Sequence, residues 1–167
     1  MEYTIRKANP NDAHGVAMSQ KEGWIFAHVN KDCNITEEDI VKHLGSDKDL
    51  EKQFKKYLER TGNPYYVVEV NDEIMGYAGC YKDDQYWTGA VYLRSPVIGH
   101  GIGGELFNSV LNDLPKGDKF LVKIATFNKR SQRMFKKIGF IKLKEQDEFH
   151  LENSDKVIPL IKMIKTI

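Results

Sequence analysis

The segment from Val91 to Leu114 constrains the fold most, because a strand, a glycine-rich turn and an amphipathic helix follow one another in it without interruption. Val91, Tyr92 and Leu93 are strand formers, and Pro96 ends the strand. The helix is indicated by apolar residues at i, i+3 and i+4 spacing: Leu106, Phe107, Val110, Leu111 and Leu114. The turn between them consists of Gly99, His100, Gly101, Ile102, Gly103 and Gly104. Glycines let a ligand approach the backbone, and a helix N-terminus favours an anion, so the segment predicts a phosphate site.

Three interpretations of this turn are open. A glycine-rich turn without a ligand is the simplest, although four glycines in six residues would cost about 0.5 to 1 kcal/mol each in backbone entropy. A dinucleotide site fits the G-x-G-x-x-G pattern of Gly99, Gly101 and Gly104, but the acidic residue expected about 20 residues later is absent from Lys123-Ile124-Ala125. A P-loop is excluded because no Lys-Ser or Lys-Thr follows the glycines.

The third interpretation comes from a resemblance that two motifs carry. Val91-Tyr92-Leu93, Pro96 and the x-x-G-x-G turn before a helix resemble motif A of the GNAT superfamily of acyl-CoA-dependent N-acetyltransferases. The segment from Asn128 to Phe140 resembles the family's motif B, N-x-x-A-x-x-x-Y-x-x-x-G-F. The two motifs stand in the family's order, and the resemblance is clear from Tyr65 to Phe140. It implies one GNAT-like domain over residues 1–167, an α/β fold with a mixed twisted sheet of about six or seven strands flanked by helices.

The resemblance also implies how acetyl-CoA would bind, in the split between the fourth and fifth strands. Strand residues Val91, Tyr92 and Leu93 would pair with the pantetheine arm. The pyrophosphate would contact the turn and its neighbour, which are Ile98, Gly99, His100, Gly101, Ile102, Gly103 and Gly104. Asn128 would lie near the arm, unless it is only a helix cap, and Phe135 occupies a further cofactor position. Lys129 or Arg130 would approach the 3′-phosphate, unless the basic residues of this helix form only a solvated face.

The chain departs from the family pattern at three positions. Ile98 stands where motif A usually has Arg or Gln, so one side-chain contact to the pyrophosphate is missing. Phe135 stands where a Tyr commonly protonates the leaving thiolate. The Glu often found just before the aromatic residue of the fourth strand falls on Gly89 or Ala90, so a common base is absent as well.

A base is still needed, because an alkylammonium with a pKa near 10.4 loses its proton at pH 7 at a cost of about 4 to 5 kcal/mol. Candidates by residue type and position near the sheet are Glu69, Tyr77, Asp84 and Tyr86. His28 or His150 could serve from flanking segments, and water could replace all of them. The catalytic residues are therefore open at this stage.

Composition excludes several other classes of function. The formal net charge is +1, from 25 basic and 24 acidic side chains mixed along the chain, so we expect no nucleic-acid partner. Cys33 and Cys80 form no disulfide framework, and no C-x-x-C or paired His spacing indicates a metal. No apolar run approaches the ~20 residues that span a bilayer, and the N-terminus lacks an apolar signal core. We therefore expect a cytoplasmic protein without a membrane partner.

The remaining segments read as alternating helices and strands. Expected helices are Asp12 to about Phe26, a short one after a capping box at Thr36–Asp39, and Asp47 to Arg60, which Thr61–Pro64 would end. Expected strands are 3–8, 65–70, 74–80, 87–93, 119–126, 140–144 and 157–165, with an acidic loop before the last of these.

The predicted activity is acetyl transfer from acetyl-CoA to a primary amine. A small amine such as a polyamine is the preferred acceptor, and a protein N-terminus or a lysine side chain is the alternative. Phe135 and the missing Glu also allow a non-catalytic CoA-binding regulatory module. A dinucleotide oxidoreductase is the third hypothesis. A homodimer is compatible with the sequence.

Overall fold

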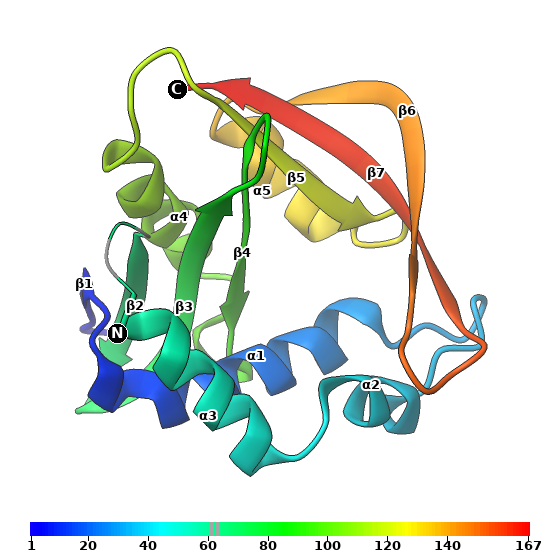
Figure 1. Ribbon diagram of the computed structural model, residues 1–167, viewed down its shortest axis with the longest axis horizontal. Coiled ribbons are helices and arrows are strands. Elements are labelled where there is room, and N and C mark those ends of the chain that lie inside the picture. The colour runs from blue at the N-terminus through cyan, green and yellow to red at the C-terminus, as the bar shows by residue number, and fades with distance from the viewer. Residues whose placement is uncertain (61, 63) are drawn as a thin grey trace.

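The computed structural model describes residues 1–60, 62 and 64–167, which form a seven-stranded twisted sheet with helices on both faces (Figure 1). The strand order is β1-β2-β3-β4-β5-β7-β6, and every neighbouring pair is antiparallel except β4 and β5. The strands are β1 (Thr4–Lys7), β2 (Tyr65–Val70), β3 (Glu73–Lys82), β4 (Trp87–Leu93), β5 (Lys119–Ala125), β6 (Ile141–His150) and β7 (Val157–Thr166). The predicted mixed α/β sheet is confirmed.

Five α-helices and two short 3₁₀ segments connect the strands in this part of the chain. They are η1 (Pro10–Asp12), α1 (Ala13–His28), α2 (Glu37–Leu44), α3 (Asp47–Leu58), η2 (Ser95–Val97), α4 (Ile102–Asn112) and α5 (Lys129–Lys137). Within the described residues, no helix combines the length and the apolar character needed to cross a bilayer.

Local chemistry explains where several elements begin and end. The predicted capping box is present, because the Thr36 hydroxyl accepts from the Asp39 N–H at 3.2 Å and the Asp39 carboxylate accepts from the Thr36 N–H at 2.9 Å. Gly45 then ends α2 with φ +79°. Asn71 and Asp72 both have positive φ, at +51° and +62°, as a two-residue hairpin turn between β2 and β3 requires. The predicted terminator of α3, Thr61–Pro64, lies partly outside the described residues.

The acidic loop before the last strand is shorter than predicted and covers only residues 151–156. β6 does not stop at Lys144 but continues to His150, and its last residues pair with the start of β7. A register shift between Lys142 and Gln146 breaks the alternation by which a strand is recognised. β6 is also an edge strand whose side chains are largely exposed, so few apolar residues mark it in the sequence.

The two faces of the sheet carry separate apolar cores. One core packs α4 and α5 against the sheet, and its aromatic centre is Phe107, with ring centroids 5.2 Å from Phe120 and 4.9 Å from Phe135. The other core packs α1 and α3 against the opposite face, around Val16 and Tyr77. Helices thus cover both faces of the sheet, and helices of both layers border the space between β4 and β5.

Candidate functional site

β4 and β5 separate almost as soon as they meet. Their parallel ladder contains only the pairs Trp87–Phe120 and Thr88–Leu121, and beyond these the two strands diverge (Figure 1). From Gly89 to Leu93, the edge of β4 that faces β5 therefore carries backbone groups without a partner strand. Such an edge can add an extended ligand as an extra strand.

A cavity of about 630 Å³ fills this split. Its walls come from β4, β5 and three helices. α1 contributes Gly23 and residues 26–28, α4 contributes its first turns together with the preceding glycine turn, and α5 contributes residues between Arg130 and Lys137. The volume lies within the range of sites for small molecules and cofactors. Because α1 covers one face of the sheet and α4 and α5 the other, the cavity passes between the layers.

The glycine turn forms one end of the cavity. Gly99 and Gly101 have φ of +99° and +83°, and Gly101 is the N-cap of α4 with no side-chain hydrogen bond to the first turn. A Cβ on Gly101 would meet nothing within 4 Å. The first amides of α4 therefore remain open to a ligand, which is what an anion site requires.

The other two glycines of the turn lie inside α4 and also line the cavity. A Cβ on Gly103 would be 3.1 Å from Met134 Sδ, so a small residue there lets α4 approach α5 closely. A Cβ on Gly104 would be 3.6 Å from Ile138, which is an ordinary van der Waals distance. The predicted cradle thus divides into Gly99 and Gly101, whose backbone conformation opens the turn, and Gly103, which has a packing role as well.

Most of the predicted cofactor residues line the cavity. These are Val91, Tyr92, Leu93, Ile98, Gly99, Gly101, Gly103, Gly104, Asn128 and Phe135. The side chains of His100 and Ile102 are not part of the wall, since His100 is exposed to solvent and Ile102 is buried in the core. Phe135 lines the cavity and packs against Phe107 and Phe140 as well, which gives an aromatic side chain a structural reason to be there.

Arg130 lies at the glycine turn. A Cβ on Gly99 would be 3.2 Å from its guanidinium, and the guanidinium also lies 5.6 Å from the ring centroid of Phe26. The neighbouring Lys129 does not line the cavity. Phe26 was not predicted as a site residue. An apolar residue near the end of a helix does not indicate from sequence alone that an arginine will pack on its ring. Asn128 caps α5, with its side-chain oxygen accepting from the Ser131 N–H at 3.1 Å.

The four base candidates named from the sequence all lie away from the cavity wall. Glu69 is bound to Arg6 at 2.7 Å, and the hydroxyl of the buried Tyr77 donates to Gln20. Asp84 and Tyr86 lie in the turn between β3 and β4. Their positions therefore do not support the expectation that one of them accepts the proton of the amine.

Of the two histidines named as candidates, His150 is exposed on β6 and His28 lines the cavity. His28 is the last residue of α1 and is 9% exposed. Its Nδ1 lies 3.1 Å from the carbonyl oxygen of Trp24. Burial lowers the pKa of His28 to about 4, with a smaller effect from His43, while the bond to Trp24 opposes the shift. His28 is therefore neutral at physiological pH.

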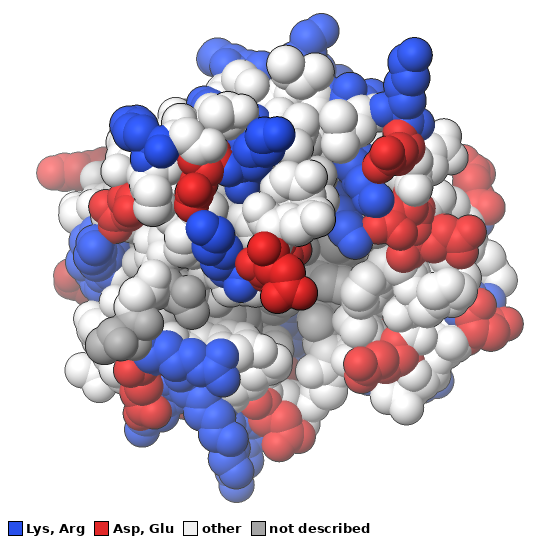
Figure 2. Space-filling model, turned by 45° about the horizontal axis from the view of Figure 1, so that its top comes forward, with Lys and Arg blue, Asp and Glu red and all other residues white. Residues whose placement is uncertain are grey.

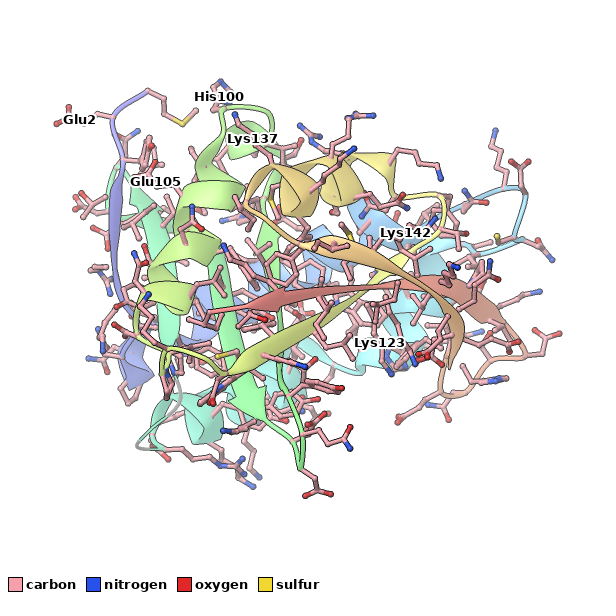
Figure 3. The ribbon with its side chains drawn as sticks, turned by 90° about the horizontal axis from the view of Figure 1, so that it is seen from above. Glu2, His100, Glu105, Lys123, Lys137 and Lys142 are labelled. Carbon is pink, nitrogen blue, oxygen red and sulfur yellow. The ribbon has the colours of Figure 1, made fainter. Side chains whose placement is uncertain are left out.

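Charges on the wall are mostly positive. Lys123, Arg130, Arg133 and Lys137 line the cavity, whereas Glu105 is its only carboxylate among the described residues. Figure 3 shows Glu105 on the β1 side of the molecule, well away from Lys123, and the Glu105 carboxylate accepts from the Tyr3 hydroxyl at 2.6 Å. On the outer face drawn in Figure 2, by contrast, acidic and basic side chains intermix. Lys123 pairs with Asp147 at 2.7 Å, and the three other basic side chains on the wall suit a phosphorylated ligand.

The described residues contain no group of three or more His, Cys, Asp or Glu that could hold a metal ion. Neither cysteine lines the cavity. Burial raises the pKa of the Cys80 thiol to about 12, so Cys80 is not available as a thiolate at neutral pH.

Comparison with known proteins decides the family. The model of the acetyltransferase (GNAT) family matches residues 31–140, which is more than half of the chain. The chain belongs to the GNAT family. The class of enzyme expected from the sequence, an acetyl-CoA-dependent N-acetyltransferase, is thereby confirmed. No curated protein matches this GNAT chain.

Solved structures share the fold of this GNAT protein at low identity. A ribosomal-protein-alanine N-acetyltransferase from Brucella melitensis is 20% identical, with a TM-score of 0.72 over 98% of this chain and 99% of its own. A phosphinothricin acetyltransferase from Sinorhizobium meliloti, solved with acetyl-CoA, is 16% identical, with a TM-score of 0.74 over 100% and 89%. The PaiA N-acetyltransferase from Thermoplasma acidophilum, solved with coenzyme A, is 15% identical, with a TM-score of 0.72 over 100% of both chains. At these identities the likeness supports the GNAT fold and does not identify an acceptor.

Proposed function

We propose that the protein transfers the acetyl group of acetyl-CoA to a small primary amine, with the coenzyme lying in the split between β4 and β5. The observation that carries the proposal is the cavity itself. It runs along the unpaired edge of β4 and ends at the open first turn of α4, beside Arg130. An extended arm followed by a diphosphate fits this order of backbone edge, amide cradle and cation.

In this arrangement each wall has a separate task. The edge from Gly89 to Leu93 aligns the pantetheine arm, and the turn at Gly99 and Gly101 binds the diphosphate through backbone amides. Arg130 supplies a cation at the diphosphate, where Ile98 offers none. α1 closes the cavity on the opposite side, so the amine enters between α1 and the strands.

The titration of His28 limits the form in which the amine reacts. Moving a proton from an ammonium with pKa near 10.4 to a group with pKa about 4 costs about 9 kcal/mol, which excludes a ground-state transfer. The amine must therefore enter deprotonated.

Calorimetry and turnover test this proposal together. We expect acetyl-CoA to bind and NAD not to bind, and the protein to release free CoA thiol with at least one member of a panel of monoamines, polyamines, amino acids, aminoglycosides and peptides. Tight binding of acetyl-CoA with no turnover of any amine would favour the non-catalytic module. Binding of NAD in preference to acetyl-CoA would favour the dinucleotide hypothesis.

A further inference from the structure

One side chain on the cavity wall has a free lone pair suited to an amine. Among the described lining residues, Lys123, Arg130, Arg133 and Lys137 carry basic side chains that donate hydrogen bonds and offer no acceptor to an amine. Burial raises the pKa of Tyr92, so its phenol keeps its proton. The carboxylate of Glu105 already accepts from Tyr3, at the β1 side of the molecule. His28 is the remaining titratable group.

The hydrogen bond of His28 fixes which ring nitrogen is free. A carbonyl oxygen can only accept, so the contact of 3.1 Å between Nδ1 and the Trp24 oxygen places the ring proton on Nδ1. Nε2 then carries a lone pair, and no described residue donates to it. In the described part of the chain, the buried side-chain atom without a hydrogen-bond partner is Trp24 Nε1, not His28 Nε2. Nε2 is therefore accessible, and the accessible space beside His28 is the cavity.

α1 places His28 at the opening between the two strands. Gly23, five residues earlier in α1, lies against β4, because a Cβ there would be 2.6 Å from the Cβ of Tyr92. Trp24 packs on the cluster that contains Ala125 of β5, and its ring centroid is 4.5 Å from that of His28. The imidazole thus faces the split from the side opposite α4 and α5.

We propose that Nε2 of His28 holds the acceptor amine and takes its proton during acetyl transfer. This inference rests on the proposed function. The amine lone pair forms a bond to the thioester carbon, the carbon–sulfur bond breaks and the CoA thiolate leaves. The proton released from the amine nitrogen passes to Nε2 and from there to the thiolate sulfur, so that amide and CoA thiol are the products and His28 is restored.

The surroundings of His28 define the expected pH dependence. His43 of α2, whose own Nδ1 accepts from the Glu152 N–H, is the titratable group that acts on the pKa of His28. Elsewhere on the cavity wall, Lys123 pairs with Asp147 at 2.7 Å and Arg130 lies at the glycine turn. In the described part of the chain, no carboxylate lies close enough to His28 to favour a charged imidazole. His28 therefore stays neutral over the working range, and the fraction of neutral amine sets the rate. We expect kcat/KM to rise with unit slope up to the pKa of the acceptor amine, without an inflection near pH 6.5.

Two substitutions separate this role from a structural one. His28→Asn keeps an amide donor where Nδ1 lies and removes Nε2, whereas His28→Gln places an amide oxygen near Nε2 and removes the Nδ1 donor. We expect His28→Asn to lower kcat by about 100-fold or more with acetyl-CoA affinity unchanged, and His28→Gln to lower it by only about tenfold. A structural role predicts the opposite order. His14→Asn, at the exposed start of the same helix, is the control and should leave kcat unchanged.

Calorimetry with acetyl-CoA and thermal unfolding accompany the kinetics, so a variant that fails to fold is recognised. In that case the pH profile of the wild type decides, measured with two acceptors whose amine pKa values differ. A rising limb that moves with the amine supports the inference, and a limb fixed near pH 6.5 for both overturns it. Activity of His28→Asn within threefold of wild type would overturn it too, while leaving the proposed function intact. A wild type that binds acetyl-CoA but acetylates no amine at pH 9 would refute both.

Discussion

Replacing Gly101 by Asp tests the diphosphate site with a change that the fold can accommodate. A Cβ at Gly101 meets nothing within 4 Å, and its φ of +83° and ψ of −11° lie in the left-handed region that Asn and Asp enter more readily than most residues. The cost to folding is about 1 kcal/mol, which corresponds to a decrease in Tm of roughly 2–4 °C for a chain of this size. The fold should therefore survive.

The effect on binding is larger, because the new carboxylate enters the space reserved for phosphate. At a separation of about 5 Å and an effective dielectric constant of about 40, each like charge costs about 1.7 kcal/mol. Two phosphate charges give about 3 kcal/mol, a loss of roughly 10²-fold in acetyl-CoA affinity. Gly101→Asn has nearly the same shape without the charge, so it should lose only a few-fold.

Isothermal titration calorimetry with acetyl-CoA measures the three affinities directly. Gly117→Asp is the matched control, because Gly117 also has positive φ (+90°) and open space around its Cβ position but lies outside the cavity wall. It should lose similar stability and no affinity. Equal affinities for Gly101→Asp and wild type, with both folded, would refute the placement of the diphosphate at this turn.

Three further predictions concern Arg130, the ion pair of Asp12 with Arg6, and Gly89 of β4. Arg130→Ala should weaken binding of both CoA and dephospho-CoA about tenfold in calorimetry, since the guanidinium lies at Gly99, while Lys129→Ala changes either by less than twofold. Asp12→Asn should lower the free energy of unfolding by about 2 kcal/mol at pH 7 in urea titrations and by much less at pH 3. Gly89→Ala should cost about 3 kcal/mol or prevent folding, because its Cβ would lie 2.1 Å from a carbonyl oxygen of β3.

The pH dependence expected for Asp12→Asn follows from the direction in which the pKa of Asp12 is shifted. Burial would raise the pKa of Asp12, but its hydrogen bonds, the first of them from Arg6 at 2.8 Å, outweigh this and hold the pKa below its usual value. A lowered pKa gives stability that is present above the unfolded pKa of about 3.9 and is lost as the pH falls through the folded value. An equal loss of stability for Asp12→Asn at both pH values would contradict this.

If Arg130→Ala weakened the binding of CoA but not of dephospho-CoA, Arg130 would contact the 3′-phosphate instead of the diphosphate.

The elements that local chemistry specifies could be predicted from the sequence. The strand, turn and helix from Val91 to Leu114 are encoded by consecutive residues, and so is the capping box at Thr36. The resemblance to the family motifs led to the proposal that the coenzyme binds at the same positions. The end of β6 could not be predicted, because its partner β7 and the register shift, not its own residues, determine where it stops.

Contacts between distant segments account for what the sequence did not reveal at the site. Arg130 meets Gly99 and Phe26 only because α1, α4 and α5 converge around the split. The sequence offered His28 as one of two candidate histidines. Its position on the cavity wall depends on the packing of α1 against Tyr92 and on its hydrogen bond to Trp24, which the sequence does not reveal. Gly103 belonged to a pattern interpreted as phosphate-binding, and its contact with Met134 of α5 adds a packing reason for a small residue there.

A crystal structure with bound acetyl-CoA tests the central claim most directly. The account predicts the pantetheine arm along the unpaired edge of β4 from Gly89 to Leu93, the diphosphate on the amides around Gly101, and the thioester within the cavity that His28 lines. A coenzyme bound at any other surface, with the split between β4 and β5 left free, would contradict it.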